Sequence, residues 1–203
     1  MVRPVELSLP LSASDVRGLK AGDLVALNGS LVTGRDRIHR YLAEERPPIE
    51  RIPFDLAGTV LYHCGPVMEK SGEGYRAVSA GPTTSMRVEQ YEPQVIREYR
   101  VKGIMGKGGM GGLTRSALQE NDCVYLHTMG GAAVYLADRI KKVRGVWKLE
   151  EFGPTEAMWL FEVEGFPAIV TMDCHGNDIH SQIEEESSRR FLELIGIKRP
   201  AVE

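Results

Sequence analysis

Short apolar runs alternate along the chain with stretches in which apolar residues recur every three or four positions. The short runs predict strands at residues 23–27, 58–63, 77–80, 103–105, 123–127, 159–164 and 168–172. The periodic stretches predict helices at residues 33–45, 94–99, 113–120, 131–140 and 179–195. Strands that alternate with helices are typical of an α/β layered domain.

Local signals refine these elements. Asn28-Gly29 predicts a turn after the first strand because both residues tolerate positive φ. The residues Gly165-Phe166-Pro167 predict a second turn, between the last two strands. Thr33 is expected to cap the first helix, and the prolines within residues 45–54 predict a connecting loop.

Composition places the chain among ordinary globular proteins. It has 203 residues, 42% of them hydrophobic, which is enough to bury a core as a single domain over residues 1–203. The 25 basic and 28 acidic side chains give a formal net charge of -3, which disfavours nucleic-acid binding. We find no apolar run of about 18 residues and no apolar signal-peptide core, so we expect no membrane contact. Three cysteines, an odd number, favour a reducing, cytoplasmic setting.

A glycine-rich segment invites a nucleotide-binding interpretation. Residues 106–111, GKGGMG, match the G-x-G-x-x-G motif between a predicted strand and a predicted helix. The acidic residue that this motif expects after the next strand is missing, and Lys107 is followed by glycine rather than by the hydroxyl residue of a phosphate loop. Two alternatives remain: an anion-binding loop with Lys107 as the countercharge, or a glycine-rich surface turn with a solvated lysine.

The segment at residues 79–87 has the composition of a carboxylate-binding loop. A Gly-Pro turn directly after a strand is followed by three hydroxyl residues and Arg87. Hydroxyls, backbone N–H groups and a guanidinium fork can bind one carboxylate together, whereas helix capping accounts for one hydroxyl only. Arg35 gives a weaker signal. It heads a predicted helix, where a cation opposes the helix dipole, but a solvated arginine is the commoner explanation.

Cysteines and histidines raise a metal hypothesis. Zinc would require His63-Cys64, Cys123, His127 and Cys174-His175 to converge. No C-x-x-C pair is present, so buried and inert cysteines explain the pattern better.

The stretch at residues 172–178 holds a group of polar side chains. Asp173, His175 and Asp178 have the chemistry of an acid–base cluster. Turn formation, with Asn177 or Asp178 as the cap of the last helix, explains the same residues more simply.

Five stretches, taken in order, resemble the β subunit of class I fumarases and L-tartrate dehydratases, which is the C-terminal domain in single-chain members. They run through nearly the whole chain, and the GPTTS-x-R and GKGGM pair is the specific part. The matching pieces are GRDRIHR (34–40), SAGPTTSMR (79–87), GKGGM (106–110), GGAAVYLADRI (130–140) and EAMWLFEVEGFPAIVTMDCHGND (156–178).

The resemblance implies a swivelling β/β/α three-layer domain and a hydro-lyase reaction, the reversible hydration of fumarate to L-malate. It also implies a [4Fe-4S] cluster held by cysteines of a partner α subunit, so this chain is expected to hold no metal and to be inactive alone. We therefore expect a heteromer, with β chains paired as a homodimer within an α2β2 assembly.

By motif, the resemblance assigns Arg35, Arg87 and Lys107 to the carboxylates of a small dicarboxylate substrate. Fixed cations suit this task because a small dianion must be held in a dry site. Thr83 would accept the proton at the C–H, and a hydroxyl is so poor a base that it would need coupling to a carboxylate of the α subunit.

Departures from the family pattern leave alternatives open. Met86 stands where the family has glycine, Val88 and Glu89 replace Met-Asp, and His63-Cys64 is unusual. L-tartrate and mesaconate therefore remain alternative substrates to fumarate. Two further classes stay open: a non-catalytic carboxylate-binding or partner-docking module, which Met86 favours slightly, and a nucleotide-binding protein.

Overall fold

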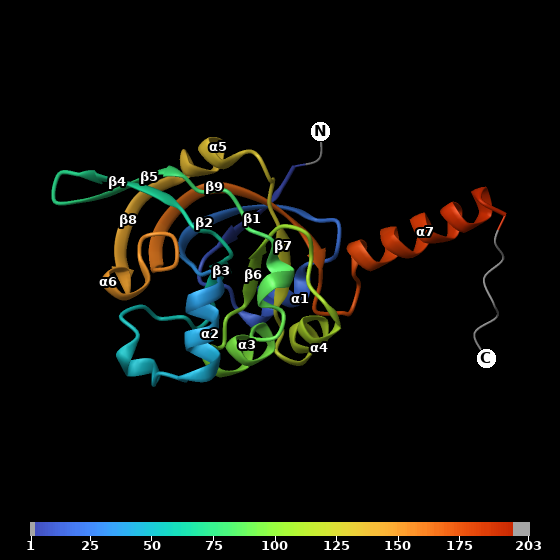
Figure 1. Cartoon of the computed structure of the whole chain (residues 1–203), viewed down its shortest axis with the longest axis horizontal. Helices are drawn as coiled ribbons and strands as arrows, with labels where there is room; N and C mark the ends of the chain where they lie inside the picture. Colours follow the sequence, from blue (N-terminus) through green and yellow to red (C-terminus); the bar gives the residue numbers. More distant parts are fainter. Residues whose placement is uncertain (1–2, 197–203) are drawn as a thin grey trace.

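The computed structural model describes residues 3–196 and has a mixed α/β architecture built on one large sheet (Figure 1). Seven strands lie in the order β1-β2-β3-β6-β7-β9-β8. Their bounds are Val5–Ser8 (β1), Leu24–Thr33 (β2), Val60–Tyr62 (β3), Gly103–Gly106 (β6), Val124–His127 (β7), Ile140–Trp147 (β8) and Met158–Met172 (β9). The predicted α/β class is confirmed.

Strands β2 and β9 close this sheet into a ring. Along one edge β2 pairs in parallel with β1 and then with β3, and along its other edge it pairs antiparallel with β9. Strands β3, β6 and β7 continue in parallel, and β7 pairs with the end of β9. The closed order is therefore β2-β3-β6-β7-β9, and the carboxyl ends of β2, β3, β6 and β7 meet at one edge.

Side chains alternate between two cores on the two faces of the ring, as the period of two in a strand requires. In β3, Tyr62 belongs to the first core and Leu61 to the second. In β7, Leu126 and Tyr125 divide in the same way. Both faces are covered, which suits parallel strands. Large members of the first core are Leu27, Tyr62, Trp159, Phe161 and Phe166.

Three helices cover the second face of the ring (Figure 1). They are α2 (Asp36–Glu44), α3 (Glu92–Tyr99) and α4 (Gly112–Glu120). Each buries an apolar stripe at helical spacing. The buried members include Ile38 and Leu42 of α2, Val95, Ile96 and Tyr99 of α3, and Ala117 and Leu118 of α4.

Smaller elements surround this body. Strands β4 and β5 form a separate two-stranded hairpin that projects at one end of the molecule (Figure 1). The remaining bounds are Ala13–Gly18 (α1), Ile49–Arg51 (η1), Val67–Ser71 (β4), Gly74–Ser79 (β5), Ser85–Val88 (η2), Ala133–Ala137 (α5), Leu149–Phe152 (α6) and Ile179–Leu194 (α7).

Both predicted turns are wrong, because each segment continues as a strand. Asn28 lies inside β2, where a bulge between Leu27 and Gly29 absorbs the irregularity and Gly29 takes φ 112°. Gly165-Phe166-Pro167 lies inside β9, opposite residues of β2. Tertiary pairing overrides the local turn signal here, since Phe166 is fully buried in the first core.

The predicted helix at residues 131–140 is mostly wrong. Only Ala133–Ala137 is helical, and Ile140–Trp147 is strand β8, which the pattern did not predict. Strand β8 pairs with β9 at the rim of the sheet, and its two lysines are exposed. Because residues on both faces of β8 are partly exposed, its sequence lacks the short apolar run that marks the inner strands.

One expectation about a helix end also changes. Thr33 is no cap: it is the last residue of β2, fully buried, and its Oγ1 accepts a hydrogen bond of 3.0 Å from the Trp159 N–H. The last helix begins close to the predicted position, but α7 buries none of its residues and extends away from the body (Figure 1). Its apolar Ile183 and Phe191 are each 59% exposed.

Candidate active site

The four residues proposed for substrate binding and catalysis all follow carboxyl ends of parallel strands or pack against them. Arg35 comes two residues after β2, and Lys107 directly follows β6. In α/β proteins with parallel strands, in open sheets and closed barrels alike, ligands bind beyond the carboxyl ends of the strands. The edge formed by β2, β3, β6 and β7 is therefore the candidate site.

Backbone contacts hold the loop at residues 80–87 against this edge. The Thr83 N–H and Oγ1–H donate to the His63 carbonyl at 2.7 and 3.0 Å. The Lys107 N–H donates to the Thr83 carbonyl, and the Ser85 N–H donates to the Lys107 carbonyl. These bonds fix Thr83 and Lys107 beside each other, although they lie on separate segments of the chain.

Both arginines of the site are paired with carboxylates. Arg87 Nε and Nη2 donate to Asp36 at 3.1 and 2.7 Å in a bidentate contact. Arg35 Nε lies 3.3 Å from Glu156 Oε1, and the second oxygen of Glu156 accepts from the Arg37 N–H. Glu156 therefore neutralises Arg35 and also supplies an anion to the start of α2, which removes the conflict between Arg35 and the helix dipole.

Lys107 forms no ion pair with any residue in the part of the chain that the structure describes. Its side chain lies along Gly130, where an added Cβ would come within 3.5 Å of Lys107 Cδ. Arg35, Arg87 and Lys107 carry three positive charges against the two carboxylates of Glu156 and Asp36. Of these three cations, Lys107 is the one without a carboxylate partner among the described residues.

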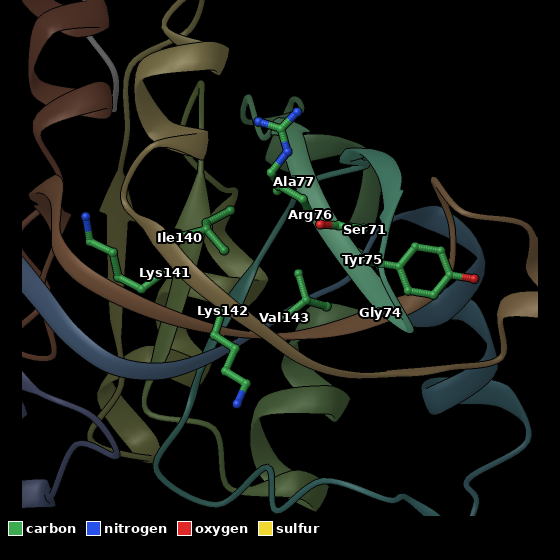
Figure 2. A pocket seen from close by; sticks show the side chains of 9 residues that line it. All are labelled: Ser71, Gly74, Tyr75, Arg76, Ala77, Ile140, Lys141, Lys142 and Val143. Atoms are coloured by element: carbon green, nitrogen blue, oxygen red, sulfur yellow. The ribbon is translucent and has the colours of Figure 1, made fainter.

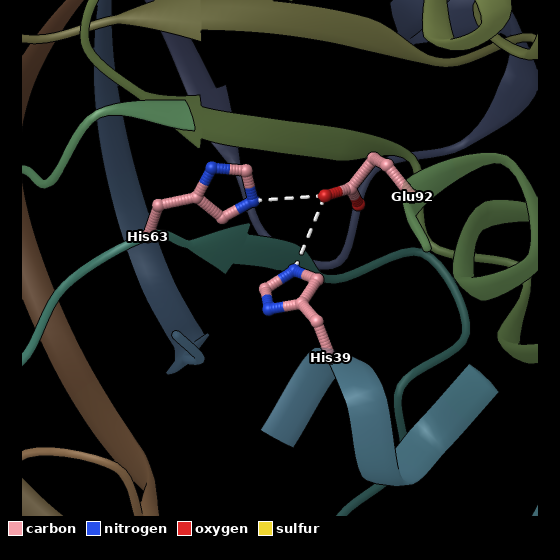
Figure 3. A group of neighbouring side chains, drawn as sticks. All are labelled: His39, His63 and Glu92. Atoms are coloured by element: carbon pink, nitrogen blue, oxygen red, sulfur yellow. Dashed lines mark ion pairs between the residues drawn. The ribbon is translucent and has the colours of Figure 1, made fainter. Parts of the chain in front are cut away.

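Beneath the loop lies a polar group whose members could not be connected from the sequence, although His63 was considered as a metal ligand and Ser85 as one of the loop hydroxyls. Ser85 is fully buried, and its Oγ lies 2.9 Å from His63 Nδ1 and 2.8 Å from the Tyr125 hydroxyl. His63 in turn contacts Glu92, which also contacts His39 (Figure 3). The sequence indicated this group only weakly. It offered one histidine in an apolar run and one glutamate at the start of a predicted helix.

The cysteines do not form a metal site. All three are buried, and burial raises the thiol pKa of Cys64, Cys123 and Cys174, which disfavours the thiolate that binds metals. Within residues 3–196, the one group of three His, Cys, Asp or Glu side chains close enough to share an ion is His39, His63 and Glu92. The donors for an iron–sulfur cluster are therefore not gathered in the described part of this chain.

Residues 173–178 serve the structure, as turn formation and capping predicted. Asp173 accepts hydrogen bonds from the N–H groups of Ala21, His175 and Asn177. Asp178 is the cap of α7, and its Oδ1 accepts from the N–H groups of His180 and Ser181. The acid–base interpretation of this stretch has no support from these contacts.

The nucleotide-binding interpretation meets a direct obstacle. A dinucleotide would place its phosphates at the start of α4, after the glycine-rich loop. There the Glu89 carboxylate already accepts bonds from the Gly111 N–H at 2.8 Å, the Thr114 N–H at 3.0 Å and the Thr114 hydroxyl at 2.7 Å. The helix start is thus satisfied by a side chain of the protein.

A surface groove of about 330 Å³ lies elsewhere, between the β4–β5 hairpin and β8 (Figure 2). None of the four predicted site residues lines it. The side chains of Lys141 and Lys142 point away from each other in this view, so they do not form a joint anion site. The groove follows from the way the hairpin packs on β8.

The site and the ring of strands define an α/β protein with basic and hydroxyl side chains at, or packed against, the carboxyl ends of its parallel strands. Residues 1–183 match the family model described as Fumarase C-terminus, and the chain belongs to this family. It is 47% identical over 193 residues to a putative fumarate hydratase class I of Geobacillus stearothermophilus, covering 95% of this chain and 36% of that protein. The chain thus spans about a third of that relative.

Two other relatives are similar to the chain over most of their own length. A putative L(+)-tartrate dehydratase subunit beta of Methanocaldococcus jannaschii is 40% identical over 188 residues, 92% of this chain and 96% of that protein. The L(+)-tartrate dehydratase subunit beta of Escherichia coli K12 is 40% identical over 175 residues, 85% of each. Among the described residues, the helices are too short or too polar to cross a membrane.

Proposed function

We propose that this chain is the β subunit of a heteromeric [4Fe-4S] hydro-lyase that hydrates fumarate reversibly to L-malate. The observation that supports the proposal is that Arg35 and Lys107 follow the carboxyl ends of neighbouring parallel strands, while the loop with Thr83 and Arg87 is hydrogen-bonded to the same edge. Under this proposal residues 1–203 form a single swivelling β/β/α domain. A cytoplasmic α subunit would carry the cluster and complete the site, with two β chains paired in an α2β2 assembly.

The three cations would bind the two carboxylates of the substrate. Lys107 has no competing anion within residues 3–196, so it is free to take one carboxylate. Arg87 uses Nε and Nη2 for Asp36, which leaves Nη1 for the other. Arg35, oriented by Glu156, would offer the guanidinium N–H groups that do not face Glu156.

Thr83 would hold or move the proton removed from the C–H. Its hydroxyl donates to the His63 carbonyl, so its orientation is fixed and its oxygen can face a substrate. A hydroxyl is too weak a base alone, and a carboxylate of the α subunit would have to take the proton onward. When bound to the partner, the cluster would supply a Lewis acid for the hydroxyl group of the substrate.

Co-expression with a candidate α subunit tests the proposal. We expect anaerobic fumarate hydration, followed by ultraviolet absorbance, to require both chains, while this chain alone is folded, colourless and inactive. Arg87→Ala should reduce kcat/KM by about 30-fold or more, because a lost buried carboxylate pair costs ~2 kcal/mol or more. Thr83→Ala should reduce kcat by about 100-fold or more, the usual contribution of a proton-transfer group.

Arg76→Ala provides the matched control. Arg76 lies on the β4–β5 hairpin, is exposed, and forms an ion pair with Glu69. It should keep wild-type kinetics. A cluster-loaded complex that turns over no dicarboxylate, or an Arg87→Ala enzyme as active as Arg76→Ala, would reject the proposal.

Tartrate dehydration is the second candidate, because two relatives with separate β subunits carry that name. Met86, which is 48% exposed within η2, occupies the substrate loop and is the residue to exchange. Comparing kcat/KM for fumarate, L-tartrate and mesaconate in the wild type and Met86→Gly decides among these substrates. If the loaded complex acts on none, a docking module becomes the better account.

A further inference from the structure

Three ionisable side chains meet in the interior directly beneath the candidate active site (Figure 3). Glu92 Oε2 lies 3.2 Å from His39 Nε2 and 3.0 Å from His63 Nε2. All three side chains are 0–1% exposed. Burying such groups is costly, so they persist only where they are paired.

The geometry assigns the proton positions. His39 Nδ1 lies 2.7 Å from the Arg35 carbonyl oxygen, which can only accept, and His39 Nε2 faces a carboxylate. Both nitrogens of His39 must therefore carry hydrogen, and the ring is an imidazolium. His63 Nδ1 faces the Ser85 hydroxyl, which can donate as well as accept, so this contact fits a neutral His63 that carries its proton on Nε2.

The electrostatics agree with this assignment. Burial alone would raise the pKa of Glu92, but the two histidines lower it to about 2, so Glu92 is ionised. Burial lowers the pKa of His39, yet Glu92, the Arg35 carbonyl and Asp36 raise it by more. For His63 burial outweighs Glu92, helped by the nearby His39, so its pKa falls. The group is thus one cation, one anion and one neutral ring.

Each histidine holds a different segment of the candidate site. The ring of His39 binds the carbonyl of Arg35. The His63 carbonyl accepts both bonds from Thr83, and its ring contacts Ser85, whose N–H binds the Lys107 carbonyl. Glu92 faces both histidines, whose rings also meet edge to face with their centroids 4.8 Å apart, and its charge holds this contact between the two segments together.

We propose that Glu92 is a positioning residue, which fixes the Arg35 segment and the 83–87 loop relative to each other through His39 and His63. The proposal rests on the function proposed above, because the connected segments are those that would bind the substrate. Reacting groups must be held within a fraction of an ångström, and a misplacement of about 1 Å costs on the order of 100-fold in rate.

The same three side chains form a His₂Glu donor set, so a bound divalent metal is the competing account. A structural zinc normally takes four protein ligands, and a catalytic zinc keeps an open position. This group offers three ligands and no exposed surface, which favours the ion-paired arrangement of His39, Glu92 and His63 over a metal site. Elemental analysis of the purified chain separates the two accounts, since one zinc per chain would overturn the proposed role of Glu92.

Nitrogen-15 NMR of the histidine rings tests the ion-paired arrangement of His39, Glu92 and His63 without any enzymatic activity. In the wild-type chain at neutral pH we expect one imidazolium, assigned by His39→Gln, and one neutral ring protonated on Nε2, assigned by His63→Gln. Glu92→Gln should convert the imidazolium to a neutral ring, whereas Glu98→Gln, on the exposed face of the same helix, should not. A neutral His39 in the wild type would overturn the proposal.

Kinetics of the complex with the α subunit test the positioning. Glu92→Gln should lower kcat/KM by about 100-fold with a raised KM, because both carboxylate-binding segments shift, while Glu98→Gln keeps wild-type values. Wild-type kinetics in Glu92→Gln would overturn the proposal. An inactive wild-type complex would instead count against the proposed function, and the ring protonation would still be readable. If Glu92→Gln does not fold, the wild-type spectrum decides.

Discussion

Asp173 is a carboxylate with no exposed surface that stays ionised because the backbone solvates it. Burial alone would raise its pKa, but the bonds from Ala21, Asn177 and His175 outweigh burial and lower it. A depressed pKa means that this group stabilises the fold at neutral pH. Its contribution is lost as the pH falls below the ordinary aspartate value and through the lower folded value.

The variant Asp173→Asn should therefore be less stable than the wild type at pH 7, and the difference should shrink as the pH is lowered through the acidic range. Thermal unfolding measured across that range checks this. Asp23→Asn is the control, since Asp23 is a turn residue whose carboxylate accepts a single bond from Lys20. A gap between wild type and Asp173→Asn that stays constant with pH would contradict the account.

Thr33 offers a second test at the same scale. Its buried hydroxyl accepts from the Trp159 N–H at the join between β2 and β9. Thr33→Val keeps the shape and leaves this N–H unpaired, so we expect a loss of about 1–3 kcal/mol in the free energy of unfolding. Chemical denaturation measures it, with the exposed Thr155→Val as the control. Equal stabilities of the two variants would refute the role of the hydroxyl.

At the scale of elements, α4 begins without a cap of its own. Gly111 precedes the helix and has no side chain, so Glu89, from the end of the substrate loop, supplies the acceptor instead. Glu89→Ala should cost about 1–2 kcal/mol, as for the loss of a helix cap, because the N–H groups of Gly111 and Thr114 lose their partner. Urea denaturation tests this against Glu120→Ala at the exposed end of α4. An unchanged midpoint in Glu89→Ala would show that water replaces the carboxylate.

The elements also show what the sequence can predict. Inner strands such as β3, β6 and β7 were predictable because short apolar runs flanked by turn residues mark them. The continuity of β2 and β9 was not, since Asn28-Gly29 and Gly165-Phe166-Pro167 are turn signals locally and are overruled by pairing between strands far apart in the chain. Strand β8 was not predicted, because its exposed lysines interrupt the pattern of apolar residues.

The candidate site was predictable to a similar extent. The loop at 79–87 and Lys107 stood out by composition, and the structure brings Thr83 and Lys107 side by side. The pairing of Arg87 with Asp36 and the contact of Glu92 with two histidines depend on tertiary packing. No spacing rule connects residues 39, 63 and 92, so only the fold reveals that group.

At the scale of the whole molecule, α7 stands apart from the body. Its Phe191 is 59% exposed, whereas Phe161 of β9 is fully buried. The same substitution should therefore have very different effects on the free energy of unfolding. Phe161→Ala should lower it by about 3–5 kcal/mol, and Phe191→Ala by at most about 0.5 kcal/mol in the isolated chain. Thermal unfolding compares them. A large loss in Phe191→Ala would mean that another surface covers α7 in solution.

The pairing of β2 with β9 sets an order of events during synthesis. The ring cannot close until residues 158–172 have left the ribosome, because they supply the partner of a strand made near the start of the chain. Until then one edge of β2 has no partner, and an open strand edge is a template for pairing with another chain. Nascent chains of this protein should therefore depend on chaperones for most of their elongation, and slowing translation after β9 should do less harm than slowing it before.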